Sequence, residues 1–424
     1  MNKTLKLLAF TLIGFSPNLY AQQKSINQRV DSLMKLMTLK EKIGQLNQYS
    51  GREVTGPAND RKTYLLNDIK TGMVGSMLNV KGVKDTREIQ AVALQSRLKI
   101  PLLFSLDVIH GYKTVFPIPL AESASWDMAA IRETAHVAAV EAAASGIHWT
   151  FAPMVDIARD PRWGRVMEGA GEDTYLGSAI ARARVLGFQG DKLGGVDAIM
   201  ACAKHFAAYG AAIAGRDYNP VDMSEQQLHE IYLPPFKAAA DANVATFMNS
   251  FNTLNGVPAT GNAYLQRDIL KGAWAYKGFV VSDWGSIREM VPWGFAKDNN
   301  QAAEKAIIAG SDMDMESEAY KKELENLVKS GKVNVKLIDD AVKRILYKKF
   351  ELGLFDDPYK FSDEQREAKV MNDPRYKEVA LAAAEKSIVL LKNTNNTLPL
   401  QKGVKSIALI GPMVNAKRIK RAVG

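Results

Sequence analysis

Cysteine and histidine are scarce in this 424-residue chain, which has one cysteine and five histidines. Cys202 cannot form an internal disulfide, and its place in the apolar run 198–203 predicts a buried thiol. The histidines are scattered, and neither a CxxC nor an HExxH motif occurs. The sequence therefore indicates no metal site and no cofactor.

Long apolar runs are also lacking. No run approaches the ~20 apolar residues that are needed to cross a bilayer, so we expect no membrane span. With 47% hydrophobic and 24% charged residues, the composition is typical of a folded globular protein. It excludes a disordered or collagen-like chain.

The main body of the chain has almost no net charge. The formal charge of +9 is concentrated at the two ends, with two lysines in residues 1–21, six basic residues in 401–424 and no acid in either segment. Subtracting these eight charges leaves +1 for residues 22–400. A nucleic-acid-binding protein is expected to carry a basic patch on its body, so we predict no nucleic-acid partner.

The first 21 residues have the pattern of a secretory signal peptide. Lys3 and Lys6 precede the apolar run Leu7–Phe15, and small or polar residues lead to Ala21. A basic start, a short apolar stretch and small residues near a cleavage point are the parts of such a signal. We therefore expect a periplasmic or secreted protein.

Short apolar runs alternate with longer amphipathic segments over about 300 residues. Most of these runs are apolar at consecutive positions, as in parallel strands that are covered on both faces. The alternation predicts an α/β fold with a TIM-type (β/α)8 barrel, and a doubly wound open sheet is the alternative. The predicted strands are Gly75–Leu78, Pro101–Leu106, His148–Ala152, Ala198–Ala203, Val244–Asn249 and Phe279–Ser282.

Charged residues stand at the ends of three predicted strands. Asp107 closes the second, Lys204 and His205 follow the fourth, and Asp283 follows the sixth. Carboxyl ends of barrel strands meet on one face, where such barrels hold their active sites. Each aspartate has the alternative role of a helix cap, but three such strand ends together favour a ligand site.

Two further features leave alternatives open. The loop 159–173 is rich in opposite charges, and its spacing does not decide between Arg162 and Arg165 as a ligand-binding arginine. Lys204 has the alternative role of a Schiff-base nucleophile.

A second domain begins near the end of the sequence. We predict a barrel domain over 22–360, a linker and connecting helix over 361–386, and an incomplete α/β sandwich domain over 387–424. Ser406–Ile410 is the predicted first strand of the sandwich. Too few residues follow it for the crossover helix and partner strand of a parallel pair.

Four ordered motifs resemble those of glycoside hydrolase family 3, and in particular its bacterial periplasmic β-glucosidases. The resemblance covers residues 26–416 and implies a barrel followed by an α/β sandwich domain, with retaining hydrolysis of terminal β-linked glucose. The motifs are Asp107–Gly111, Arg162–Arg165 with Gly171–Asp173, Lys204–Phe206 and Val281–Asp283.

The resemblance also implies roles for individual residues. Asp283 matches the catalytic nucleophile, and the substrate is a small-molecule or oligosaccharide β-glucoside. The residues that match the family's sugar-binding positions are Asp107, Arg165, Lys204 and His205, and Arg216 is expected to add a contact.

The chain departs from the family in two places. Phe251 stands where the family often has a tyrosine, and no residue matches the general acid/base, which the family carries in the sandwich domain. We therefore expect a truncated glucosidase that is weakly active on its own. The alternative is a non-catalytic protein that binds glucose or another sugar.

Overall fold

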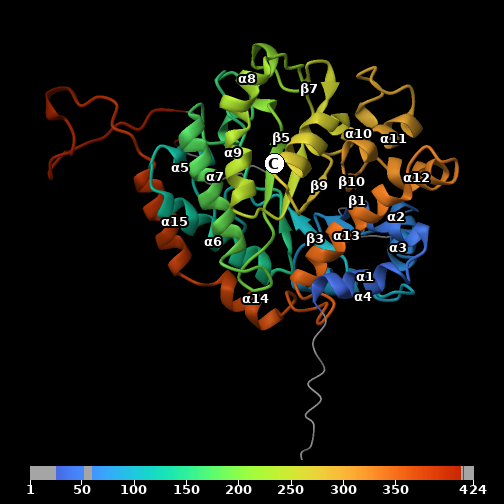
Figure 1. Ribbon diagram of the computed structural model, residues 1–424. Coiled ribbons are helices and arrows are strands. Elements are labelled where there is room, and N and C mark those ends of the chain that lie inside the picture. The colour runs from blue at the N-terminus through green and yellow to red at the C-terminus, as the bar shows by residue number, and fades with distance from the viewer. Residues whose placement is uncertain (1–24, 52–59, 412–413, 415–424) are drawn as a thin grey trace, which may run out of the picture.

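The computed structural model describes residues 25–51, 60–411 and 414, and a barrel of parallel strands lies at its centre (Figure 1). Five strands pair in the order β10-β1-β2-β3-β4 and three in the order β5-β6-β9. Parallel bridges at Trp149–Met200 and Val281–Met313 join these two sheets at both edges, so the barrel is closed. The predicted (β/α)8 architecture is confirmed.

Eight parallel strands form this barrel within the described residues. They are β1 Asn47–Ser50, β2 Ser76–Leu78, β3 Leu103–Leu106, β4 Trp149–Thr150, β5 Cys202–Phe206, β6 Thr246–Asn249, β9 Phe279–Val281 and β10 Asp314–Met315. A two-stranded hairpin, β7 Thr253–Leu254 and β8 Val257–Pro258, lies in the loop after β6.

Helices cover the outside of the barrel (Figure 1). The longer ones are α1 Ile26–Met34, α2 Leu39–Gln45, α3 Asp60–Lys70, α4 Val83–Ala93, α6 Met128–Ala144, α7 Thr174–Gln189, α9 Pro234–Asp241, the π-helix Tyr264–Ala273, α11 Asn299–Ala309, α12 Ala319–Lys329, α13 Val335–Glu351, α14 Glu364–Met371 and α15 Arg375–Lys386. The short ones are α5 Pro119–Ser123, α8 Glu225–Gln227 and α10 Ser286–Glu289.

The first and last strands of the barrel, β1 and β10, are not among the strands predicted from the sequence. β1 is rich in polar residues, and β10 has only two residues, so neither forms an apolar run. Inside the barrel the polar side chain of Gln48 of β1 bonds to the neighbouring strands: its amide donates to Ser76 Oγ of β2 at 2.7 Å and to Ser105 Oγ of β3 at 3.2 Å. Buried polar groups are tolerated where they pair in this way.

The segment 224–242 is divided into three helical parts. Ser224 Oγ accepts a hydrogen bond from the backbone N–H of Gln227 at 3.2 Å, which makes Ser224 the N-cap of α8. After α8 the backbone widens into the π-helix Leu228–Tyr232, and α9 starts at Pro234. Prolines at 234 and 235 have no N–H to continue the preceding helix, which explains the break.

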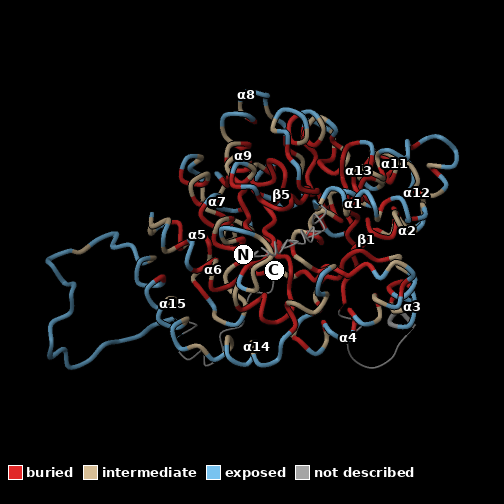
Figure 2. Tube along the Cα trace, turned by 60° about the horizontal axis from the view of Figure 1, so that its bottom comes forward, coloured by how far each residue is buried: buried red, intermediate tan, exposed pale blue. Residues whose placement is uncertain are grey.

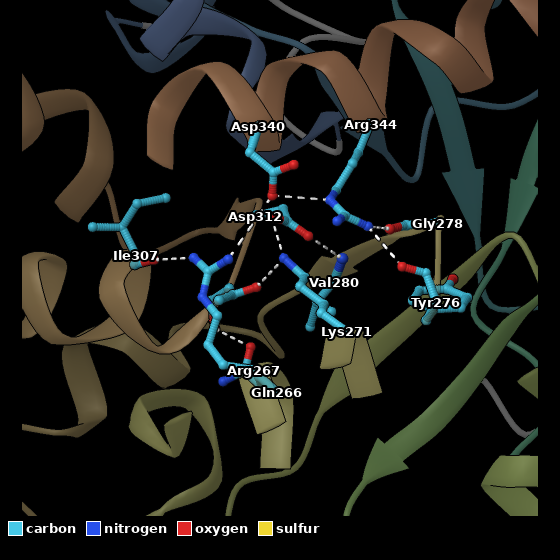
Figure 3. A network of polar contacts seen from close by, with 12 residues as sticks. Gln266, Arg267, Lys271, Tyr276, Gly278, Val280, Ile307, Asp312, Asp340 and Arg344 are labelled. Carbon is cyan, nitrogen blue, oxygen red and sulfur yellow. Dashed lines mark hydrogen bonds and ion pairs between the residues drawn. The ribbon is translucent and has the colours of Figure 1, made fainter. Parts of the chain in front are cut away.

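A network of charged residues pins the amino-terminal ends of β9 and β10 (Figure 3). Lys271 Nζ donates to Asp312 Oδ1 at 2.6 Å, and Asp312 Oδ2 accepts from the N–H of Val280 at 2.8 Å. Arg344 of α13 donates to the carbonyl of Gly278 at 2.9 Å. These contacts lie at the end of the barrel opposite to the carboxyl ends of its strands, and they connect α13 and the π-helix 264–273 to the strands.

The segment after the barrel packs against it and then leaves it. α14 and α15 both contact α6. From Ile388 to Ile410 the chain is largely exposed and extends away from the barrel (Figures 1 and 2). The predicted strand Ser406–Ile410 is wrong for this structure, because no neighbouring strand pairs with it within the described residues.

Two other predictions concern burial and export. Cys202 is fully buried, as predicted. The predicted signal peptide, residues 1–21, lies outside the described residues. No helix in the described ranges is long and apolar enough to cross a membrane.

Candidate active site

The site lies at the carboxyl ends of the barrel strands. Asp107 directly follows β3, Asp156 lies in the loop after β4, and Asp283 stands two residues after β9. Because all eight strands are parallel, these ends share one mouth of the barrel. The predicted convergence of strand-end charges is therefore present.

Lys204 and His205 lie inside β5. The sequence had placed both residues just after this strand, so the predicted position is corrected by a few residues. Both side chains are buried. The pairing of β5 with β6 is irregular between Ala203 and Phe206. Such a bulge re-aims side chains, which explains how two consecutive residues of one strand both reach the site.

Lys204 forms an ion pair with Asp107. Its Nζ donates to Asp107 Oδ1 at 2.8 Å, and the lysine side chain is 4% exposed. Burial alone would lower the pKa of Lys204, but the negative charges of Asp107 and Glu168 outweigh burial and raise it. Lys204 is therefore an ammonium at neutral pH, which does not favour the Schiff-base alternative, since that chemistry needs a neutral amine.

His205 is held by a buried carboxylate that the sequence analysis did not single out. Asp156 Oδ2 accepts a hydrogen bond from the backbone N–H of His205 and pairs with its ring Nδ1, both at 2.9 Å. Burial raises the pKa of Asp156 to about 7 and lowers that of His205 well below its usual value. The imidazole is therefore neutral near pH 7, and Asp156 sets its orientation.

Asp283 is the carboxylate towards which these groups converge. Its Oδ2 lies 3.7 Å from His205 Nε2, and its Oδ1 accepts from the backbone N–H of Trp284 at 2.6 Å. Burial raises the pKa of Asp283 to about 6, although the positive charges of Arg165 and Lys204 oppose this shift. The carboxylate is thus fixed in position and ionised at neutral pH.

The structure separates the two arginines that spacing left undecided. Arg165 makes a double hydrogen bond to Glu168, at 2.8 and 3.0 Å, and its guanidinium lies 5.7 Å from the ring centre of Tyr209. Arg162 is 70% exposed and pairs with Asp160. Of these two arginines, Arg165 is the one whose positive charge acts on Asp283, so it is the arginine of the site.

Arg216 does not join this group through a bond. It is exposed, and its side chain forms no hydrogen bond or ion pair with the described residues. Its neighbour Asp217 accepts from the indole N–H of Trp163 at 2.9 Å, which ties this loop to the loop that carries Arg165.

A cavity of about 500 Å³ opens beside the site. Its lining combines charged residues, among them Asp107 and Glu168, with apolar ones such as Ile109, Met167 and Met371. This size and this mixture of surfaces are typical of pockets for small organic ligands. Among the described residues, no group of three or more His, Cys, Asp or Glu side chains is arranged to hold a metal ion.

Comparison with known proteins identifies relatives of one family. The profile of the glycosyl hydrolase family 3 N-terminal domain matches residues 38–347. The chain is 44% identical over 393 residues to "Periplasmic beta-glucosidase" of Salmonella typhimurium, covering 92% of this chain and 51% of that protein. It is 34% identical over 410 residues to "Putative beta-xylosidase" of Formosa agariphila, covering 92% and 54%.

A solved structure is similar at the level of the fold as well. The β-glucosidase from Listeria innocua in complex with glucose superposes with a TM-score of 0.84 at 43% sequence identity, over 88% of this chain and 53% of that one. The chain thus spans about half the length of the relatives it matches.

Proposed function

The chain belongs to glycosyl hydrolase family 3, and from this membership and the geometry around Asp283 we propose that it is a retaining glycosidase that releases terminal β-D-glucose from β-glucosides. The observation that carries the proposal is a fixed, ionised Asp283 with His205, Lys204 and Arg165 beside it. Relatives with names of both glucosidases and xylosidases support the wider class of β-glycosides, and the glucosidases support glucose.

In the proposed reaction, Asp283 attacks the anomeric carbon of the bound sugar. Its carboxylate oxygen forms a bond to C1 while the bond from C1 to the leaving oxygen breaks, and that oxygen takes up a proton. Water then attacks C1 of the glycosyl-enzyme and gives up a proton to the group that had protonated the leaving oxygen, while the bond between C1 and Asp283 breaks and glucose leaves with the original configuration.

The other polar groups of the site are proposed to hold the sugar hydroxyls. The Lys204 ammonium and the Arg165 guanidinium have donors to offer, and Asp107 has free acceptor capacity beyond its bond to Lys204. His205 Nε2 has no hydrogen-bond partner within the described residues and lies beside Asp283. We keep Arg216 as a proposed additional contact from the adjoining loop.

The proton donor for the leaving group is proposed to lie outside the barrel. Asp107 is engaged with Lys204, and hydrogen bonding from Arg165 lowers the pKa of Glu168 despite its burial. Neither carboxylate is therefore suited to protonate a leaving group. Glu289 of α10 is the rival candidate for the proton donor within the barrel. Burial raises its pKa, and its Oε2 has no partner within the described residues.

Turnover by this chain is therefore expected to depend strongly on the leaving group. The aryl leaving group of an activated aryl β-glucoside departs as a stable anion without protonation. The leaving sugar of cellobiose needs general acid catalysis, which contributes about 10²–10⁴-fold. Initial rates with both substrates measure the difference. If the unaltered chain hydrolyses cellobiose efficiently and Glu289→Gln abolishes this activity, the proposal is contradicted and the donor lies in the barrel. The surface variant Glu230→Gln is the matched control.

The ionisation of Asp283 predicts the pH dependence. Because only the carboxylate attacks and its pKa is about 6, kcat/KM for an aryl glucoside is expected to fall about tenfold per pH unit below that value. A profile from pH 4 to 8 measures the midpoint. A midpoint near 4, the usual value of an aspartate, would show that burial does not raise the pKa of the attacking group.

We also propose the domain boundaries and the location that the sequence predicts. The family profile falls inside the proposed barrel domain, 22–360, and α14 and α15 fall inside the connecting segment, 361–386. Residues 387–424 remain the proposed start of the sandwich domain. A periplasmic or secreted location is supported by the name of the Salmonella relative.

A further inference from the structure

One side of the candidate site is formed by aromatic rings. The ring of Tyr209 lies 5.2 Å from that of His205 and 5.9 Å from that of Phe251. The ring of Tyr218 in turn lies 4.4 Å from that of Phe251, at an interplanar angle of 35°. We call Tyr209, Phe251 and Tyr218 the aromatic wall, and it leads from the imidazole beside Asp283 towards solvent.

Tyr218 is the open end of this wall. It is 44% exposed, whereas Tyr209 and Phe251 are buried. An aromatic face that stays open beside a polar site is available to a ligand. Tyr218 also carries a hydroxyl group at this open end, whereas Phe251, the buried ring against which it packs, has none.

The loop that carries Tyr218 is constrained by contacts with the neighbouring loop. Asp217 bonds to the buried Trp163, and a Cβ atom added at Gly215 would stand 2.8 Å from the carboxyl carbon of Asp160. Tyr218 itself has a φ of +63°, which bulky side chains rarely adopt. Strained backbone of this kind persists where its surroundings enforce it, and it is concentrated at functional sites.

Acidic groups of the site influence the pKa of the Tyr218 hydroxyl. Burial raises the pKa of Tyr218 to about 12, and the negative charges of Asp283, Glu289 and Asp217 add to this shift, whereas Arg165 opposes it. The phenol therefore keeps its proton at neutral pH and has a hydrogen-bond donor to offer to a ligand.

We propose that Tyr218 binds the glycoside, with its ring against the sugar and its hydroxyl donating to a sugar oxygen beside Asp283. A pyranose has both apolar C–H faces and hydroxyl groups, and an exposed phenol offers a surface for each. Tyr218 is thus a specificity residue of the site that the sequence motifs do not include. This inference rests on the proposed function, because it takes the ligand to be a sugar.

Calorimetric binding of D-glucono-1,5-lactone to the purified 424-residue chain tests the proposal without requiring turnover. Tyr218→Phe, which removes the hydroxyl alone, is expected to weaken binding about 5-fold, the usual effect of one neutral hydrogen bond. Tyr218→Ala, which also removes the ring, is expected to weaken it about 20-fold or more. Tyr175→Ala is the control, since Tyr175 is 83% exposed and belongs to α7, outside the aromatic wall.

The outcomes separate this proposal from the function on which it rests. If both Tyr218 variants bind as tightly as the unaltered chain, Tyr218 has no role in binding, while the proposed function stands. If the unaltered chain binds no sugar and cleaves no glucoside, both proposals fall. If Tyr218→Ala does not fold, as judged by thermal unfolding, Tyr218→Phe decides the question alone, because it keeps the ring on Phe251.

Discussion

Asp283→Asn is expected to lower the rate of aryl β-glucoside cleavage by on the order of 10⁴-fold or more, which is the scale of losing a catalytic nucleophile. The amide has nearly the same shape as the carboxylate and no negative charge with which to attack C1. The oxygen of the introduced amide would still accept the N–H of Trp284, so sugar binding should be largely kept. Rates and calorimetric binding are measured on the same preparation.

A covalent trap identifies the attacking group directly. A 2-deoxy-2-fluoro glucoside with an activated leaving group should label the peptide that contains Asp283, and mass spectrometry locates the label. Asp191→Asn is the control, because Asp191 is fully at the surface, where it pairs with Arg132. Label on another residue would overturn the assignment, and sugar binding without turnover in the unaltered chain would favour the alternative of a non-catalytic sugar-binding protein.

Lys349→Met is expected to stabilise the protein by about 2–4 kcal/mol at pH 6, which is the scale of removing a buried charge. Lys349 of α13 is fully buried, and its Nζ donates to Gln45 Oε1 at 2.6 Å. No carboxylate pairs with it in the described part of the chain, and burial lowers its pKa to about 7. Methionine fills a similar volume without the charge.

The lowered pKa of Lys349 also determines how the free energy of unfolding changes with pH. Between about pH 7 and the ordinary lysine value of 10.5, the unfolded chain holds a proton at residue 349 that the folded chain has released. Unfolding therefore takes up a proton in this window, and the free energy of unfolding rises with pH across it. In Lys349→Met this rise should disappear, and the gain over the unaltered chain should be largest at and below pH 7.

Urea unfolding from pH 6 to 10 measures both effects. Lys343→Met is the matched control, because Lys343 lies on the same helix, is half exposed and pairs with Asp31 at the surface. Such surface pairs contribute little, so a small change is expected there. A destabilised Lys349→Met protein would show that the bond to Gln45 outweighs the cost of burying the amine.

The sequence was sufficient to predict those barrel strands that consist of apolar residues. Val280 and its neighbours in β9 form such a run, as do the residues of β3 and β6. β10 has only two residues and is too short to form an apolar run, and the buried Gln48 of β1 pairs with Ser76 and Ser105 of two other strands. Hydrophobic periodicity does not register pairing between distant residues, so this part of the fold was not predictable.

The same limit applied to the site. The strand-end positions of Asp107 and Asp283 were visible in the sequence, and the structure places both at the mouth of the barrel. The role of Asp156 as the partner of His205 was not visible, although its place after a predicted strand was a signal that could have been used. Arg165 and Arg162 were equivalent by spacing, and their different carboxylate partners, their exposure and the effect of Arg165 on Asp283 distinguish them.

The order of apolar runs and charged strand ends was enough to favour a barrel and to locate the charged positions at β3, β5 and β9, because both follow from local patterning. The tertiary structure decided which groups meet: Lys204 with Asp107, His205 with Asp156 and Asp283, and Tyr218 with Phe251. The reason is physical, since pKa shifts, ion pairs and ring contacts depend on burial and on distances between residues that are far apart in the chain.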